Sequence, residues 1–195
     1  MPAIFKRLTN MNNSINYGRI CGFTVLYVVT VFATAFLGYL APFYWVGFPV
    51  VAALLGAFSY YMVATKWQAF GVSTLLSVVL AGLLLVLDEC TLPRCVLMVL
   101  AGVLADIVRM MAGNESHDAM TYAYPIQSVG VVAWILPLWT HTTWYHDGAA
   151  REMSPDYANG LMAFASPWAL VLLILITALA GYIGLRYVAS RKSRS

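Results

Sequence analysis

The chain has 195 residues, of which 62% are hydrophobic and 10% are charged, and its formal net charge is +3. A soluble domain usually has about a quarter charged residues and could not bury this much apolar side chain, so a soluble globule is excluded. The few basic residues form no cluster interleaved with aromatic residues, which excludes a nucleic-acid-binding protein.

Long apolar runs occur along the whole chain, and a membrane-spanning helix needs about 20 such residues. The first run, from Ile20 to Thr65, has no charge and is too long for one span. Pro42 and Pro49 predict two helices joined by a tight turn, because proline interrupts the helical hydrogen bonds. The pattern predicts an all-α polytopic membrane protein. Its six transmembrane helices are expected at residues 20–42, 48–65, 69–87, 93–112, 119–140 and 167–187, in a domain of residues 20–188 between an N-terminal tail (1–19) and a basic C-terminal tail (189–195).

The basic residues predict the orientation of this bundle. Six spans place both termini on one side of the membrane, whereas the other side has only Arg94 and Arg151 among several acidic residues. The bundle is expected in a bacterial cell membrane, and by the positive-inside rule both termini are expected on its cytoplasmic side. Nine of the eleven basic residues agree with this orientation: Lys6, Arg7, Arg19, Lys66, Arg109, Arg186, Arg191, Lys192 and Arg194.

Small residues on the first predicted helix form a possible contact face. Helices in lipid associate by close packing at such residues. Gly18 and Gly22 are four apart, and Ala33 follows eleven residues later on the same helical face. The face could pack within the bundle or dock a second membrane protein.

Two charged residues, Asp106 and Arg109, lie inside the fourth predicted helix. Charges at membrane depth usually face protein or water. One interpretation is an Asp106–Arg109 pair one turn apart, with Arg109 reaching the cytoplasmic interface. In the other, Asp106 anchors this helix against a partner helix or switches during a transport cycle.

The stretch LWTHTTWYHD, residues 138–147, contains two of the three histidines. His141 and His146 have no recognised zinc spacing, so no metal site is expected. The aromatic residues here are typical of an interfacial belt, but they could also form a lid over a ligand pocket. The next residues favour the lid, because Ser154 and Pro155 can start a short helix and a loop of residues 141–166 exceeds what a connection needs.

Cys90 and Cys95 lie in the short outer loop ECTLPRC. On an oxidising face they could form a disulfide, and free thiols are equally compatible with the spacing.

The order and spacing of three segments resemble a known family. These segments are GVLAD at 102–106, EMSPDYANGLMAF at 152–164 and SPWALVLLILITALAGYIG at 166–184. With six short helices, they resemble the substrate-capture (S) components of energy-coupling factor (ECF) transporters, and more narrowly the integral membrane family Trep_Strep, grouped with those components.

The resemblance implies a non-enzymatic subunit that binds a vitamin or other small nutrient at the outer face. It also implies partners, namely an ECF transmembrane coupling protein and two cytoplasmic ATPases. The coupling protein contacts small residues of the first helix, often alanines four apart, for which Gly18, Gly22 and Ala33 are the nearest equivalents here. ATP belongs to the partners, because this chain has no Gly-rich phosphate loop and needs no cofactor of its own.

Position alone predicts a set of pocket residues, in which aromatic faces would stack on a flat or cationic nutrient and a carboxylate would pair with its polar end. The predicted set is Tyr44, Trp45, Trp134, Trp139, Trp144, Asp147, Glu152, Tyr157 and Trp168. Two other functions stay open: a membrane assembly protein without a ligand, and an intramembrane enzyme using the histidines, Asp106 or the cysteines.

Overall fold

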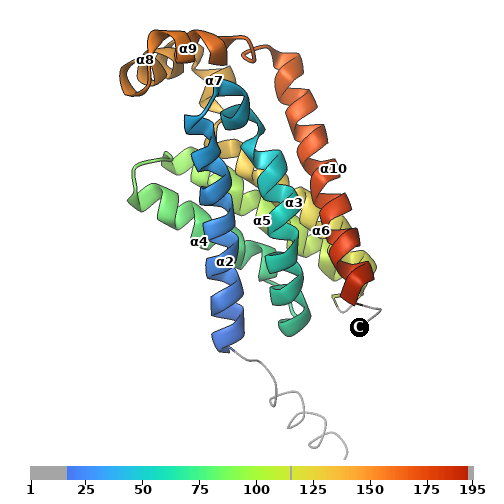
Figure 1. Ribbon diagram of the computed structural model, residues 1–195. Helices are drawn as coiled ribbons and strands as arrows, with labels where there is room; N and C mark the ends of the chain where they lie inside the picture. The colour runs from blue at the N-terminus through green and yellow to red at the C-terminus, as the bar shows by residue number, and fades with distance from the viewer. Residues whose placement is uncertain (1–16, 115, 193–195) are drawn as a thin grey trace, which may run out of the picture.

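A computed structural model describes residues 17–114 and 116–192, and these residues form helices without strands. Both described ends of the chain lie at one end of the molecule, and a small helical layer covers the other (Figure 1). The helices are α2 (Tyr17–Phe36), η1 (Leu37–Tyr39), α3 (Pro42–Lys66), α4 (Val72–Val86), α5 (Leu92–Met111), α6 (His117–Val129), η2 (Gly130–Trp134), α7 (Pro137–Thr140), α8 (Thr142–Glu152), α9 (Pro155–Met162) and α10 (Pro167–Lys192).

The prediction of a tight turn between Pro42 and Pro49 is wrong. Pro42 occupies the first turn of α3, and the helix continues through Pro49 to Lys66. Proline is well placed at a helix start, and helices in membranes tolerate an internal proline where neighbouring groups compensate. Tyr44 and Trp45 therefore lie in the first turns of a helix, not in a connecting turn.

The predicted fifth span, residues 119–140, is also not one helix. The chain changes from α6 to η2 at Gly130 and then to the short α7 at Pro137. Proline cannot donate a backbone hydrogen bond, so Pro137 suits the start of a new helix. The break turns this part of the chain beneath the covering layer.

Close helix approach at small residues holds the bundle together. A Cβ atom at Gly184 on α10 would lie 2.7 Å from the carbonyl oxygen of Leu54 on α3. A Cβ atom at Gly102 on α5 would lie 2.8 Å from the carbonyl oxygen of Ser73 on α4. A larger side chain at either glycine would push the helix backbones apart, as expected for packing in lipid.

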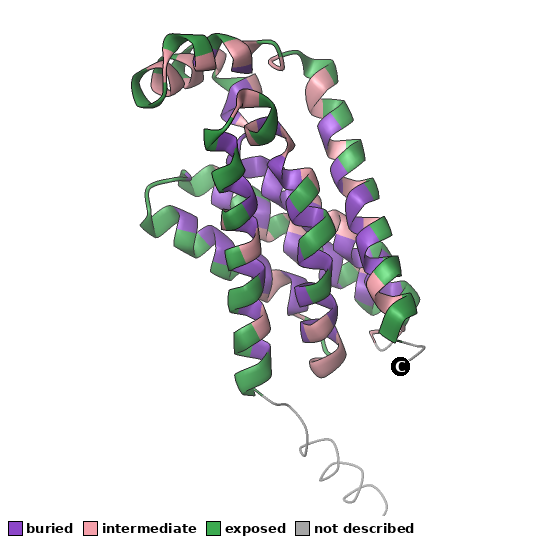
Figure 2. Cartoon of the chain, in the orientation of Figure 1, coloured by how far each residue is buried: buried purple, intermediate pink, exposed green. Residues whose placement is uncertain are grey.

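Three described helices, α2 with η1, α3 and α10, are long and apolar enough to cross a membrane, so the six-span arrangement is not confirmed. The apolar sequence of α5 is interrupted by the charged residues Arg94, Asp106 and Arg109, and α6 is only 13 residues long. The bundle buries its inward faces and exposes apolar outer faces, notably on α10 (Figure 2). These exposed apolar faces fit a bilayer environment.

Candidate ligand pocket beneath the helical cap

Two short helices, α8 and α9, form a cap over one end of the bundle (Figure 1). The predicted loop of residues 141–166 thus contains two helices where one was expected. The predicted start of α9 is confirmed, because the Ser154 hydroxyl accepts a hydrogen bond from the Tyr157 backbone N–H at 3.1 Å. α8 has no buried residue, whereas α9 buries Ala158 and Leu161, and Leu161 packs into the core of the bundle.

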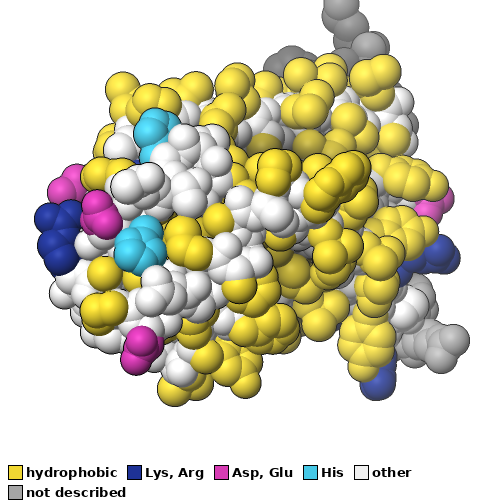
Figure 3. Space-filling model, turned by 90° about the horizontal axis from the view of Figure 1, so that it is seen from above, with side chains coloured by type: hydrophobic (Ala, Val, Ile, Leu, Met, Phe, Trp, Pro, Cys, Tyr) yellow, Lys and Arg dark blue, Asp and Glu magenta, His cyan; other side chains and the backbone are white. Residues whose placement is uncertain are grey.

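The cap covers a cavity of about 350 Å³, a volume within the usual range for small-molecule sites. α8 lines it through Trp144, Tyr145, Gly148, Ala149, Arg151 and Glu152. The end of α2, η1, the start of α3 and the α4–α5 turn form the other walls. Seen from above, charged side chains lie mainly toward the margins of the cap face, with hydrophobic side chains between them (Figure 3).

Three aromatic hydrogen bonds fasten the cap to the bundle. Trp45 Nε1 on α3 donates to the Tyr145 hydroxyl on α8. The Tyr157 hydroxyl on α9 donates to the Gly38 carbonyl oxygen at 2.6 Å. Trp139 Nε1 on α7 donates to the Phe164 carbonyl oxygen at 2.9 Å.

The floor of the pocket is an aromatic cluster. Trp134 of η2 contacts Phe32, Trp45 and Phe48, with ring centroids 5.4, 5.8 and 5.3 Å away. Such tilted and edge-to-face arrangements are the favoured geometry for aromatic pairs. The break between α6 and α7 places Trp134 here, which the prediction of a straight fifth span could not show.

The α4–α5 turn brings charge to the pocket. Asp88 and Glu89 line it from this turn, Arg94 from the first turn of α5, and Arg151 and Glu152 from α8. Asp88 follows the C-cap residue of α4 and lies in the left-handed backbone region, with φ of 60°, where Asp and Asn are tolerated better than most residues. Sequence reasoning missed these turn residues, although a charged loop on the predicted outer side was the available signal.

The structure brings five of the nine predicted pocket residues together: Trp45, Trp134, Trp144, Glu152 and Tyr157. The other four lie outside the lining. Tyr44 is exposed beside Phe43, and Trp139 is used in the bond to Phe164. Asp147 is exposed and contacts His146, and Trp168 is 82% exposed at the start of α10.

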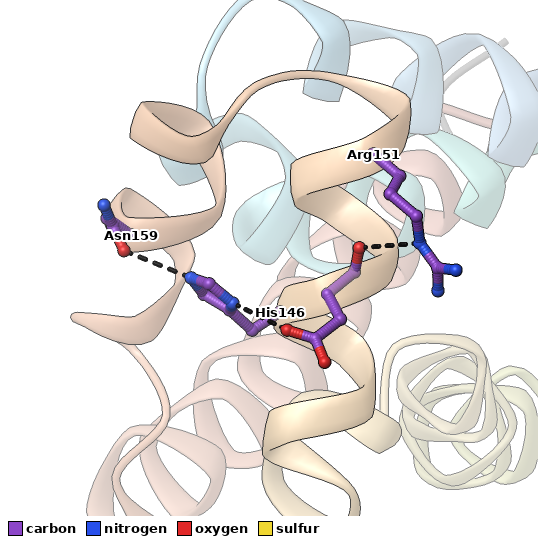
Figure 4. Close-up of polar contacts among 4 residues, drawn as sticks. His146, Arg151 and Asn159 are labelled. Atoms are coloured by element: carbon purple, nitrogen blue, oxygen red, sulfur yellow. Dashed lines mark hydrogen bonds and ion pairs between the residues drawn. The ribbon is translucent and has the colours of Figure 1, made fainter.

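His146 of α8 contacts Asn159 of α9 and so joins the two cap helices (Figure 4). His146 Nε2 lies 3.1 Å from Asn159 Oδ1 of α9, and its Nδ1 lies 3.3 Å from Asp147 Oδ1. The hydrogen bond to Asn159, and then that to Asp147, raises the pKa of His146 above its usual value. Arg151 Nε donates to the Asp147 carbonyl oxygen at 3.1 Å (Figure 4). Within the described residues, no group of His, Cys, Asp and Glu side chains could hold a metal ion.

Asp106 and Arg109 do not form the predicted pair. Asp106 accepts hydrogen bonds from the backbone N–H groups of Ser73 and Thr74, at 2.9 and 2.8 Å, and from the Thr74 hydroxyl. Arg109 does not extend to the molecular surface, because it is 0% exposed and donates to backbone carbonyls around the α3–α4 turn. The interpretation of Asp106 as an anchor to a neighbouring helix agrees with these contacts.

The small-residue face of α2 points away from the bundle. Gly18, Gly22 and Ala33 are exposed, and a Cβ atom at Gly22 would meet nothing within 4 Å. Cys90 and Cys95 are buried free thiols, so the disulfide alternative is not formed. The predicted tail residues Lys6, Arg7 and Arg194 lie outside the described residues.

A family model described as "Hypothetical bacterial integral membrane protein (Trep_Strep)" matches residues 19–191. No curated protein and no solved structure matches the chain.

Proposed function

The chain belongs to the Trep_Strep family of bacterial integral membrane proteins, and from this premise we propose that it is a substrate-capture subunit. In this proposal the cap pocket binds a vitamin or other small nutrient, and the protein is the S component of an ECF-type importer. The chain itself catalyses no reaction.

The pocket is the observation that carries the proposal. A hollow of about 350 Å³ lies at the end of a bundle whose other end holds both described chain ends. Its walls combine several aromatic faces with a few charged side chains, which is the usual composition of a small-molecule site. A membrane assembly protein without a ligand has no need for such a lined cavity.

The charge distribution supports an outward-facing pocket. The pocket has three carboxylates, Asp88, Glu89 and Glu152, with two arginines, Arg94 and Arg151. The last turns of α10, at the opposite end, have only basic charged residues: Arg186, Arg191 and Lys192. Under the positive-inside rule the cap then faces outward and both termini are cytoplasmic. A nutrient could enter the pocket from outside the cell.

The exposed face of α2 suits the proposed partner. Gly18, Gly22 and Ala33 leave a helix surface that another membrane helix can approach closely. We assign this face to the ECF coupling protein. That protein would connect the chain to two cytoplasmic ATPases, which supply the ATP hydrolysis that drives import.

Mass spectrometry of small molecules released from gently purified protein tests the proposal. A compound retained by the wild type should be absent from Gly148→Trp, because Gly148 lines the pocket and a tryptophan there would fill it. Gly82→Trp is the matched control, since Gly82 lies outside the lining and also has open space. Equal retention by both variants, or no retained compound in the wild type, contradicts the proposal.

A further inference from the structure

We propose that Arg94 and Tyr145 form a carboxylate-binding subsite in the cap pocket, and that the ligand is a small aromatic monocarboxylate. This inference rests on the proposed function, because it names the ligand class of the same pocket.

Arg94 is held in a fixed orientation by two neutral acceptors. Its Nε donates to the Thr91 hydroxyl at 3.0 Å, and its Nη1 donates to the Trp134 carbonyl oxygen at 2.9 Å. In the part of the chain that the structure describes, no carboxylate pairs with Arg94 and its Nη2 group has no acceptor. A half-buried guanidinium with an unused edge is suited to binding an incoming carboxylate.

Tyr145 offers a second donor beside Arg94. Its hydroxyl oxygen accepts from Trp45 Nε1, while its own proton has no acceptor among the described residues. Burial raises the pKa of Tyr145 to about 12, so the phenol keeps this proton at neutral pH. Both residues line the same cavity, and the residues that hold them, Trp134 for Arg94 and Trp45 for Tyr145, pack with ring centroids 5.8 Å apart. Two donors in one cavity can serve the two oxygens of one carboxylate.

The surrounding side chains restrict the rest of the ligand. Trp45, Trp134 and Phe32 line the pocket as an aromatic floor, where a flat ring can join the edge-to-face cluster. The lining also contains three carboxylates, Asp88, Glu89 and Glu152, and a second arginine, Arg151; all four are exposed, so water screens their charges. The three carboxylates oppose a ligand with several negative charges, which favours a monocarboxylate over a phosphate ester.

Isothermal titration calorimetry on the full chain in lipid nanodiscs can measure how much the carboxylate contributes to the binding affinity. The probes are indole-3-propionate and its amide, which share the ring and shape but differ in charge, and the oppositely charged tryptamine. Because the acid alone makes charge-assisted hydrogen bonds, it should bind about tenfold more tightly than the amide, or better. Tryptamine should bind more weakly than the amide.

Substitutions of Arg94 separate binding from positioning. Arg94→Gln should remove the preference for acid over amide, because it weakens binding of the acid more than binding of the amide. An equal loss for both probes would show that Arg94 only supports Trp134, which overturns the subsite. Arg94→Lys should keep part of the preference, since it retains the charge but loses the planar fork. Arg186→Gln is the matched control, because Arg186 contacts Tyr182 on α10, outside the pocket.

Three further results would overturn the inference. Equal binding of acid and amide by the wild type would do so, as would a preference that survives in Arg94→Gln or binding by none of the probes. A retained natural compound without a carboxylate would reject this ligand class and leave nutrient capture standing. Failure of every probe together with no retained compound would count against the proposed function as well.

Discussion

Asp106 and Arg109 lie one turn apart on α5 but bind opposite ends of the same connection. Asp106 accepts from the N–H groups that begin α4, and Arg109 donates to the Ala64 and Trp67 carbonyl oxygens that end α3. Negative charge is favourable at a helix start and positive charge at a helix end. One turn of α5 therefore fixes the α3–α4 turn from both sides.

Asp106→Ala should destabilise the protein strongly. The substitution leaves three donors at Ser73 and Thr74 without an acceptor, two of them backbone N–H groups at a helix start. The expected loss is about 1.5–3 kcal/mol, the value of hydrogen bonds to a charged group. Thermal unfolding in detergent measures it, with Asp118→Ala as the control because Asp118 is exposed. Equal melting temperatures for the two variants would show that Asp106 does not anchor the turn.

Hydropathy and helix-start signals predicted those helices whose sequence is one uninterrupted apolar run or begins with a clear cap. The expected ranges 69–87 and 93–112 correspond closely to α4 (Val72–Val86) and α5 (Leu92–Met111), and the Ser154 cap was found from two residues. The break after α6 was missed because η2 is as apolar as a membrane helix. Only packing of Trp134 against Trp45 and Phe32 distinguishes it.

Only part of the pocket lining could be predicted, because some of its residues follow local patterns and others depend on helix packing. Aromatic residues near a predicted lid are visible in a sequence, so Trp45, Trp134 and Trp144 were found. Glu89 lies in the α4–α5 connection and Arg94 in the first turn of α5, and their place at the pocket depends on how these two helices pack, which no local pattern reveals. The predicted Asp106–Arg109 pair is wrong for the same reason. Sequence spacing does not show that the α3–α4 turn offers backbone groups to both side chains.

Gly22→Leu should weaken association with the proposed coupling protein without disturbing the fold. A Cβ atom at Gly22 has nothing within 4 Å, so leucine fits the isolated chain but blocks close approach of another helix. Co-purification with the coupling protein measures the effect. Gly82→Leu is the control, because Gly82 has equal space on α4. Unchanged complex formation by Gly22→Leu would exclude this face of α2.

Trp144→Ala should weaken ligand binding by about 2- to 10-fold, the value of one aromatic contact. Trp144 lines the pocket from α8 and is 61% exposed, so its loss should leave the melting temperature nearly unchanged. Trp168→Ala removes an equally large and exposed ring outside the lining and should bind normally. Titration calorimetry with the retained compound compares them. Equal affinities for both variants would remove Trp144 from the site.

The junction between α8 and α9 should weaken as the pH rises. Hydrogen bonds to Asn159 and Asp147 raise the pKa of His146, because an imidazolium can donate to both oxygens whereas a neutral ring can donate to only one. A raised pKa in the folded state means that this contribution is fully present below the unfolded pKa of about 6.5 and is lost as the pH rises through the folded value.

Nuclear magnetic resonance of the histidine ring protons measures this titration. His146 should titrate above about 6.5, the value for an unperturbed histidine. Asn159→Ala removes the larger cause of the shift, so it should lower the His146 pKa, and Asp147→Asn should lower it as well. Both substitutions should make hydrogen exchange in α9 less dependent on pH. A His146 pKa that neither substitution moves would show that the imidazolium does not connect the two cap helices.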